Sequence, residues 1–258
     1  MYMTLKKISK IIFLIILFSS SFISFAQSPK QLLEKANTLY SEAVYDSALI
    51  TYHAVLDKGY VSDALYYNLG NTYFKLKDIP SAILYYEKSL KINPSDEDVK
   101  NNLQIANSMI VDKIEVIPQL FFRVWWTSFY TMLPANSWAW ISVFIFLLAL
   151  LATYLYLTSF NTVVRKTAFF TGIVLIFLTI MSFGLASQKY YYTQQTNEAI
   201  VFTPTITIKS SPAQSSVDLF VLHEGTKVAL LDKTNGWTKI RIANGSVGWL
   251  PENVLKGI

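Results

Sequence analysis

Residues 64–96 read ALYYNLGNTYFKLKDIPSAILYYEKSLKINPSD, and much of this pattern recurs along the chain at one fixed spacing. The matched pairs are Asn37 and Asn71, Asn68 and Asn102, Tyr40 and Phe74, Ala48 and Ala82, and Tyr52 and Tyr86. A fixed period of about 34 residues indicates stacked helix–turn–helix units. We therefore predict one copy over Pro29–Ser62, a second over Asp63–Asp96, and a closing helix over Glu97–Met109, within a repeat domain of residues 28–112.

The repeated residues suit close contact between helices. Ala48 and Ala82 are small enough to let two helices approach, and aromatic side chains fill the space beside them. Pro94 cannot continue a helix, and Asp96 can cap the next one. The residues that we assign to repeat packing are Ala48, Gly70, Ala82, Tyr86 and Pro94.

The second copy resembles the tetratricopeptide repeat at nearly every family position, through YYNLGNTYF, SAILYYEKSL and the proline that follows. The first copy departs from the family, because Ala36 replaces the usual Gly and Tyr60 the usual Pro. The resemblance implies a concave groove for an extended peptide or a partner helix. It also implies that the groove is lined by Asn37, Asn68, Asn71 and Asn102. An amide offers a peptide backbone both donors and an acceptor. Alternatively, these asparagines are consensus residues that stabilise the repeat.

Residues 1–26 show the pattern of a secretory signal. Lysines precede the apolar run IIFLIILF at residues 11–18, and small residues follow up to Ala26. This arrangement predicts a signal peptide that is cleaved between Ala26 and Gln27. The alternative is an uncleaved anchor over residues 8–25. Both predict that the chain from residue 28 onward is exported.

Two apolar runs predict transmembrane helices over residues 138–157 and 167–187, because about 20 apolar residues cross the hydrocarbon core. Arg165 and Lys166 place the connecting residues 158–166 in the cytoplasm. Neither run contains an ionisable residue, so we expect anchors and not a proton or ion path. The aromatic residues 113–137 predict a linker in the headgroup layer, or alternatively a strip that binds a partner.

Residues 198–258 consist of short β-branched segments separated by Gly, Pro and Asn, which predicts a small β-barrel of six strands. The order IKSSP, LHEGTKV, GWTKIRI, GSVGWLPENVL resembles a bacterial SH3-type domain. The resemblance implies that Gly236–Trp237 and Gly248–Trp249 pin strands and that Leu255 packs the core. Members of this family often bind peptides or cell-wall material. We expect both tryptophans to belong to the core, the alternative being a ligand platform.

The composition and motifs argue against several function classes. The chain has no cysteine, two histidines, and a net charge of +5 without a basic cluster, so we expect no metal site, no cofactor and no nucleic-acid partner. HEGTK at residues 223–227 begins like a zinc-binding HExxH motif, but Lys227 replaces the second histidine. We therefore expect a protein that is not an enzyme.

The whole order is similar to the BatE family of the Bacteroides aerotolerance (Bat) operon, in its architecture and in the run LHEGTKV…GW.P. The expected fold is a multi-domain membrane protein with all-α tetratricopeptide repeats, two transmembrane helices and an all-β SH3-like barrel. The resemblance implies an inner-membrane scaffold, with both soluble domains in the periplasm. Its partners would be von Willebrand factor A-domain membrane proteins and a MoxR-type ATPase, in aerotolerance or envelope stress. The alternative is a cell-wall sensor whose SH3-like domain binds peptidoglycan.

Overall fold

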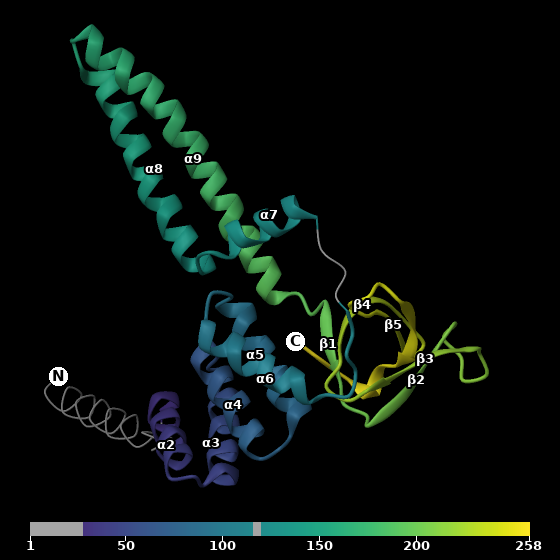
Figure 1. Cartoon of the computed structure of the whole chain (residues 1–258). Coiled ribbons are helices and arrows are strands. Elements are labelled where there is room, and N and C mark those ends of the chain that lie inside the picture. The colour runs from purple at the N-terminus through teal and green to yellow at the C-terminus, as the bar shows by residue number, and fades with distance from the viewer. Residues whose placement is uncertain (1–27, 116–119) are drawn as a thin grey trace, which may run out of the picture.

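The computed structural model describes residues 28–115 and 120–258 (Figure 1). The predicted signal peptide, with cleavage between Ala26 and Gln27, lies outside these residues. The described part begins with the helices α2 (Pro29–Ser41), α3 (Tyr45–Asp57), α4 (Asp63–Lys75), α5 (Ile79–Ile92) and α6 (Glu97–Met109). They form two helix–turn–helix units and a closing helix, in agreement with the period of the sequence.

Short polar side chains set the helix starts. The hydroxyl of Ser62 accepts a hydrogen bond from the amide of Leu65 at 3.1 Å and so caps α4. The carboxylate of Asp96 accepts one from the amide of Val99 at 3.1 Å and caps α6. Pro94 lies in the turn between α5 and α6, where its missing amide hydrogen costs no helical bond.

The turns within the two units share one backbone conformation. Ala43 and Lys77, which occupy equivalent positions in the two repeats, have positive φ angles of 60° and 68°. In each turn the next amide closes back onto the preceding helix, from Val44 to the Leu39 carbonyl and from Asp78 to the Tyr73 carbonyl. The similarity between the two repeats therefore includes the left-handed backbone conformation of the residue that follows each first helix.

The tightest contact in the repeats joins α4 and α5. A Cβ atom at Gly70 would lie 2.5 Å from Cδ1 of Tyr86, so only glycine lets the two helices approach this closely. Tyr86 is buried, and so are Ala48 and Ala82 at the corresponding positions of the two second helices. The ring of Tyr86 thus fills the space that Gly70 leaves.

Two long apolar helices, α8 (Ala135–Thr158) and α9 (Thr162–Gln194), form a hairpin that projects away from the other domains (Figure 1). Both are long and apolar enough to cross a membrane. The predicted connection over residues 158–166 is shorter in the structure, because the side chain of Asn161 caps α9 through the amide of Val163 at 2.9 Å. Helix α9 also continues beyond the predicted span of 167–187.

Small and hydroxylated residues join the two hairpin helices. The hydroxyl of Ser142 donates to the carbonyl oxygen of Thr179 at 3.2 Å, and that of Ser182 donates to the carbonyl oxygen of Trp138 at 2.9 Å. The large apolar side chains point outward and are exposed. Helices that meet through small residues and present apolar side chains outward are typical of a lipid environment.

The aromatic linker contains helix α7 (Phe121–Thr131), which lies beside α9 at the base of the hairpin (Figure 1). The indole nitrogen of Trp138 donates to the Tyr130 carbonyl at 3.1 Å, and the rings of Tyr130 and Tyr192 meet edge to face. Phe121 and Trp125 are exposed on the other side of α7. An exposed aromatic face at this level suits the interface of a bilayer.

The C-terminal domain is an antiparallel sheet with the strand order β3-β2-β6-β5-β4-β1-β7. The strands are β1 (Glu198–Val201), β2 (Thr205–Lys209), β3 (Asp218–His223), β4 (Lys227–Thr234), β5 (Trp237–Arg241), β6 (Val247–Pro251) and β7 (Leu255–Gly257). The sequence predicts six strands, and the seventh arises because a short 3-10 helix, Glu252–Val254, divides the last predicted segment. Asn235 and Gly236, both with positive φ, form the two-residue turn between β4 and β5.

One expectation for this domain is wrong. Trp237 and Trp249 are only half-buried and do not belong to the core cluster of Val201, Ile208, Ile240 and Leu250. Small aliphatic residues fill the interior of so short a sheet, and the indoles lie at its surface. Gly248 does hold strands together, because a Cβ atom there would lie 2.3 Å from Cγ2 of Ile208. Leu255 packs against the core cluster, as predicted.

The sheet domain docks onto the repeats through a continuous hydrophobic cluster, in which Ile83 and Val99 of the repeats meet Ile200 and Ile258. Two polar contacts flank this cluster. One is an ion pair of Lys227 with Glu87 at 2.8 Å and with Glu198 at 2.9 Å. The shared core and these contacts fix the orientation of one domain relative to the other.

The second polar contact is made by Asp112, between α6 and α7. Its carboxylate accepts hydrogen bonds from the Thr226 hydroxyl at 2.6 Å and from the His223 amide at 2.7 Å, and it pairs with Nδ1 of His223 at 2.7 Å. Burial on its own would raise the pKa of Asp112, but these bonds more than offset burial and lower the pKa. Asp112 is therefore held ionised against the sheet domain.

We expect Gly70→Ala to destabilise the fold by about 1–3 kcal/mol, because overpacking displaces a well-packed side chain, here the buried ring of Tyr86. Gly184→Ala in α9 is the matched control, since nothing lies within 4 Å of a Cβ atom there and alanine favours a helix. Thermal unfolding of the full chain in neutral detergent, followed by circular dichroism, measures both. Equal stability of the two variants would show that the ring of Tyr86 can move away from an added methyl group at residue 70 at little cost.

Candidate functional site

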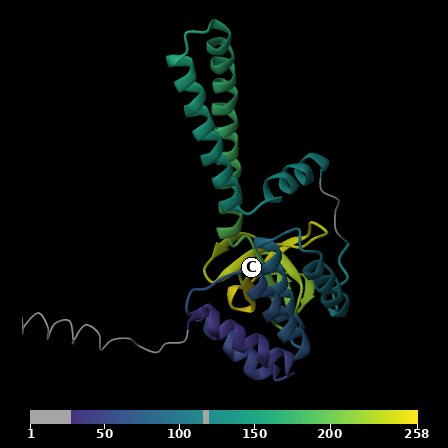
Figure 2. The same cartoon turned by 90° about the vertical axis from the view of Figure 1, so that its left-hand side faces the viewer.

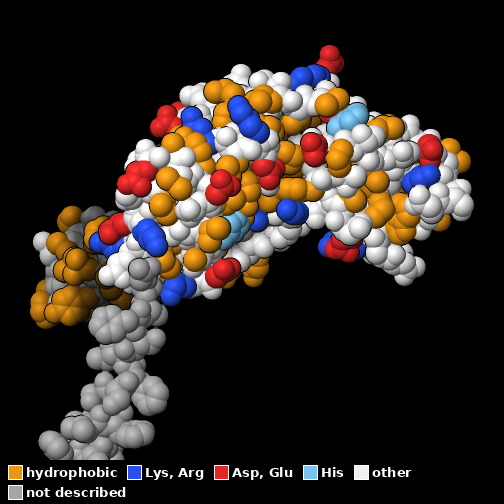
Figure 3. All heavy atoms as spheres, turned by 90° about the horizontal axis from the view of Figure 1, so that it is seen from below, with side chains coloured by type: hydrophobic (Ala, Val, Ile, Leu, Met, Phe, Trp, Pro, Cys, Tyr) orange, Lys and Arg blue, Asp and Glu red, His pale blue; other side chains and the backbone are white. Residues whose placement is uncertain are grey.

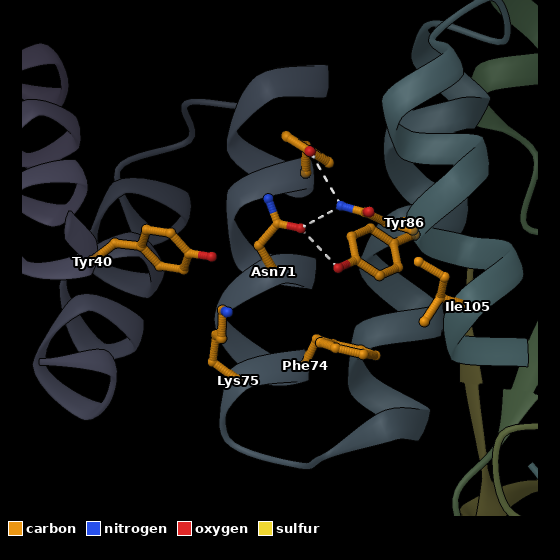
Figure 4. Close-up of a pocket in the computed structure, with 8 residues that line it drawn as sticks. Tyr40, Asn71, Phe74, Lys75, Tyr86 and Ile105 are labelled. Atoms are coloured by element: carbon orange, nitrogen blue, oxygen red, sulfur yellow. Dashed lines mark hydrogen bonds between the residues drawn. The ribbon is translucent and has the colours of Figure 1, made fainter. Parts of the chain in front are cut away.

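The strongest candidate for a binding site is a groove on the repeat helices (Figure 4). It has a volume of about 270 Å³. Its lining comes from α2, α4, α5 and α6 and consists of Tyr40, Tyr67, Asn71, Phe74, Lys75, Tyr86, Asn102 and Ile105. Aromatic walls surround two amides and one ammonium group, a composition that suits an extended peptide.

The four asparagines form two equivalent pairs in the first helices of the repeats. The Oδ1 atom of Asn71 accepts from the hydroxyl of Tyr86 at 2.8 Å and from Nδ2 of Asn102 at 2.9 Å (Figure 4). One repeat earlier, Oδ1 of Asn37 accepts from the hydroxyl of Tyr52 at 2.7 Å and from Nδ2 of Asn68 at 3.0 Å. The same two hydrogen bonds therefore occur twice, at equivalent positions of the repeat. Nδ2 of Asn102 makes one more, to the Tyr67 hydroxyl at 3.1 Å, which has no counterpart at Asn68.

Each pair leaves one donor and one acceptor unused within the described residues. The Nδ2 atoms of Asn37 and Asn71 donate no hydrogen bond there, and the Oδ1 atoms of Asn68 and Asn102 accept none. A peptide unit offers one N–H donor and one C=O acceptor, so each amide pair complements one peptide unit of a bound segment.

Two buried tyrosines fix the orientation of these amides. Burial, with a smaller effect of neighbouring Tyr40, raises the pKa of Tyr52 to about 12. Burial likewise raises the pKa of Tyr86, although a hydrogen bond with Asn102 opposes the shift. Both hydroxyls stay protonated at neutral pH and donate to Oδ1, which leaves each Nδ2 atom of Asn37 and Asn71 available.

The predicted site residues fall into two structural groups. Ala48, Gly70, Ala82 and Tyr86 lie between the repeat helices, and Pro94 lies in the turn after α5. The asparagines lie on α2, α4 and α6 and bond to one another in pairs. Half of their hydrogen-bonding capacity stabilises the repeats, and the other half is available. That a partner uses the available half stays a prediction.

Sequence reasoning missed the apolar and charged part of the groove. Lys75 follows Asn68 and Asn71 at helical spacing on α4, and Ile105 lies close after Asn102 on α6. Residues at such spacings share one face of a helix, so the pattern could have identified both. Tyr40 is itself a repeat position, but its place on the groove depends on how α2 stacks on α4.

A second surface lies on the sheet domain. The indole of Trp249 is half-buried, and the ammonium group of Lys239 lies 5.9 Å from its ring centroid. The register places both Lys209 and Lys239 opposite Trp249. A half-exposed aromatic ring beside amines is a surface that can stack on a sugar or a peptide.

Comparisons with known families match the repeats and the sheet domain separately. Residues 64–96 match the tetratricopeptide repeat, and residues 204–256 match the bacterial SH3 domain. No curated protein matches the chain. Tetratricopeptide repeats bind proteins, and bacterial SH3 domains bind peptidoglycan or proteins, so both matched families are typically binding domains without catalytic activity.

The described residues offer little that points to other chemistry. Among residues 28–115 and 120–258, no group of three His, Asp or Glu side chains is arranged to hold a metal ion. On the face shown in Figure 3, Lys and Arg side chains are interspersed with Asp and Glu. This face therefore lacks the single-sign field that steers nucleic acid.

Proposed function

We propose that this chain is a membrane-anchored scaffold without catalytic activity, which binds an extended segment of a protein partner in the groove of its repeats. The observation that carries the proposal is the repeated amide pair. Within the part of the chain that the structure describes, Asn71 with Asn102, and Asn37 with Asn68, each present an unused donor group and an unused acceptor after their internal bonds are made.

The geometry favours backbone recognition of the partner. The two amide pairs recur with the repeat on successive first helices, α2 with α4 and α4 with α6. Asn71 and Asn102 line the groove, and the proposed path of the partner continues from there to Asn37 and Asn68, which lie one repeat earlier and outside the lining. Tyr40, Phe74 and Ile105 supply apolar contacts between the pairs, and Lys75 supplies a positive charge. A peptide with an apolar side chain and a nearby carboxylate fits this lining.

The finer part of the proposal concerns the assembly. The order of repeats, hairpin and SH3-like domain resembles the BatE family, which supports a place in a Bat-type complex. The partners would be membrane proteins with a von Willebrand factor A domain, acting with a MoxR-type ATPase in aerotolerance or envelope stress. The hairpin supports this assignment because it would hold the groove close to partners in the same membrane.

We expect the double variant Asn37→Asp with Asn71→Asp to lower partner recovery roughly 30-fold. Aspartate keeps the Oδ1 acceptor for Tyr52 and Tyr86 but replaces each groove-facing donor with an oxygen. Two lost hydrogen bonds, each with a net value of about 1 kcal/mol, account for this factor. Affinity purification of the full chain from native membranes, with partners quantified by mass spectrometry, measures the recovery.

Asn101→Asp is the matched control for this experiment, because it makes the same change at an exposed residue of α6 that does not line the groove. Its recovery of the partner should stay near wild type. Wild-type recovery by the double variant of Asn37 and Asn71, with helicity intact, would rule out the groove as the contact. Recovery of a von Willebrand factor A-domain protein would support the Bat-type assembly.

We further propose that the repeats and the sheet domain both lie in the periplasm of a bacterial inner membrane. The predicted export signal, the two apolar helices and the positive charges of Arg165 and Lys166 near the tip of the hairpin support this orientation. Alkaline phosphatase fused after Ile258 should be active, and a fusion after Asn161 should be inactive. The reverse pattern of activity would show that both domains lie on the cytoplasmic side.

A second function, cell-wall sensing, is favoured by one observation, the half-exposed Trp249 beside Lys239. If the scaffold proposal is correct, the full chain should stay in the supernatant when it is centrifuged with purified peptidoglycan. Sedimentation that Trp249→Ala abolishes, and that the aspartate variant of the groove leaves unchanged, would instead establish the sensor.

A further inference from the structure

Lys189 is a buried cation near the end of α9. Its side chain is 1% exposed, and its ammonium group donates one hydrogen bond, to the carbonyl oxygen of Lys91 at 3.1 Å. The ring of Tyr192 lies 5.6 Å from the same nitrogen. An ammonium group has three donors, and a buried charge is costly unless an anion balances it. Among the described residues, no salt bridge includes Lys189.

Lys189 lines a cleft of about 630 Å³ together with two more lysines, Lys88 and Lys91 of α5. The side-chain salt bridges among the described residues include neither of these lysines. Lys91 donates to the carbonyl oxygen of Gln195 at 2.7 Å and to a carboxylate oxygen of the terminal residue Ile258 at 2.8 Å. Three ammonium groups therefore line one cleft. Lys91 is bonded to the terminal carboxylate, whereas Lys189 bonds only to a carbonyl oxygen and Lys88 to no acceptor among the described residues.

Among the described residues, no side-chain carboxylate pairs with Lys88 or Lys189. Glu87 on α5 and Glu198 on β1 both pair with Lys227, at 2.8 Å and 2.9 Å. Burial lowers the pKa of Lys88, and the charges of Lys91 and Lys256 lower it further. Burial also lowers the pKa of Lys91, partly opposed by Glu198. The cleft thus crowds like charges that a bound anion would stabilise.

The start of α8 faces the same cleft through Pro134, Ala135 and Asn136. This helix has no side-chain cap, and the amides of Ala135 and Asn136 donate no hydrogen bond within the described residues. The positive end of a 24-residue helix adds to the potential of the lysines. Its contribution is secondary, because the buried Lys189 alone already requires a counter-charge.

The cleft lies at the base of the hairpin, where α8 begins and α9 ends. Figure 2 shows this end of the hairpin next to the other domains. A span of 33 residues is about 50 Å long and exceeds the hydrocarbon core of about 30 Å. The last turns of α9, which carry Lys189 and Tyr190, therefore emerge at the level of the phospholipid headgroups. This position is the same for either orientation of the hairpin.

We propose that this cleft binds the phosphate of an anionic phospholipid headgroup, which the ammonium groups of Lys88, Lys91 and Lys189 neutralise. The bound lipid would fill the cleft between the hairpin, the repeats and the C-terminal residues Gly257 and Ile258. The inference rests on the proposed membrane insertion of the hairpin but is independent of the partner in the groove.

The test is the thermal stability of the full chain in neutral detergent with three added probes. These are short-chain phosphatidylglycerol, short-chain phosphatidylcholine and inorganic phosphate. A ligand that binds only the folded state raises the unfolding temperature, so we expect a rise with phosphatidylglycerol that the other two probes do not match. An equal effect of phosphatidylcholine or of inorganic phosphate would overturn the proposal.

The double variant Lys88→Gln with Lys91→Gln should bind phosphatidylglycerol roughly 20-fold more weakly, since each lysine near an anionic surface contributes about a fivefold factor. Lys35→Gln, an exposed residue of α2, is the matched control and should bind like wild type. Equal binding by the double variant and the control would refute the assignment.

Lys189→Met supplies a second measurement, in case the double variant does not fold. Methionine has a similar volume and no charge, so without lipid the stability should stay the same or rise, and the response to phosphatidylglycerol should be lost. If Lys189→Met strongly destabilises the protein but the response to phosphatidylglycerol is retained, the role of Lys189 is only structural, through its hydrogen bond to the Lys91 carbonyl oxygen. Carbonate extraction of membranes reports hairpin insertion separately, and partner recovery reports the groove separately.

Discussion

The contact of Tyr86 with Gly70 and Asn71 links the packing of the repeats to the groove. The missing Cβ atom of Gly70 brings α5 against α4, and the ring of Tyr86 fills the gap. The buried hydroxyl must then find an acceptor, because an unsatisfied polar group costs about 1–3 kcal/mol. It finds Oδ1 of Asn71, and this bond orients the amide so that its donor is available in the groove. Packing and recognition thus depend on the same side chain.

Helix α5 connects this groove to the other parts of the molecule. Tyr86 faces the groove, Ile83 joins the hydrophobic cluster shared with the sheet domain, and Glu87 pairs with Lys227. Lys88 and Lys91 face the cleft at the base of the hairpin. Because one rigid helix presents these faces, the groove, the sheet domain and the hairpin have fixed relative positions. A partner bound in the groove, as proposed, would therefore be held at a defined place relative to the hairpin.

The sequence predicts local structure in this chain better than contacts between domains. The repeat period gives the repeat helices, and the apolar runs give the hairpin, because both patterns reside in neighbouring residues. The predicted connection at 158–166 is too long, since it leaves out the cap that Asn161 forms on α9. Asp112 and His223 are distant in sequence, and no local pattern indicates that they meet. The prediction for the two tryptophans is wrong because aliphatic side chains, and not the indoles, form the core cluster of the sheet.

The two candidate sites differ in how far the sequence could reveal them. The amide pairs recur with the repeat, so Asn37, Asn68, Asn71 and Asn102 are recognisable from the sequence alone. Lys189 has no such signal, since a lysine after an apolar helix normally reaches water. Only the packing of α5, α8 and the C-terminal strand around it removes that water, and no carboxylate among the described residues pairs with its charge. The need for a counter-ion is therefore a property of the assembled junction, and it follows from burial and not from residue type.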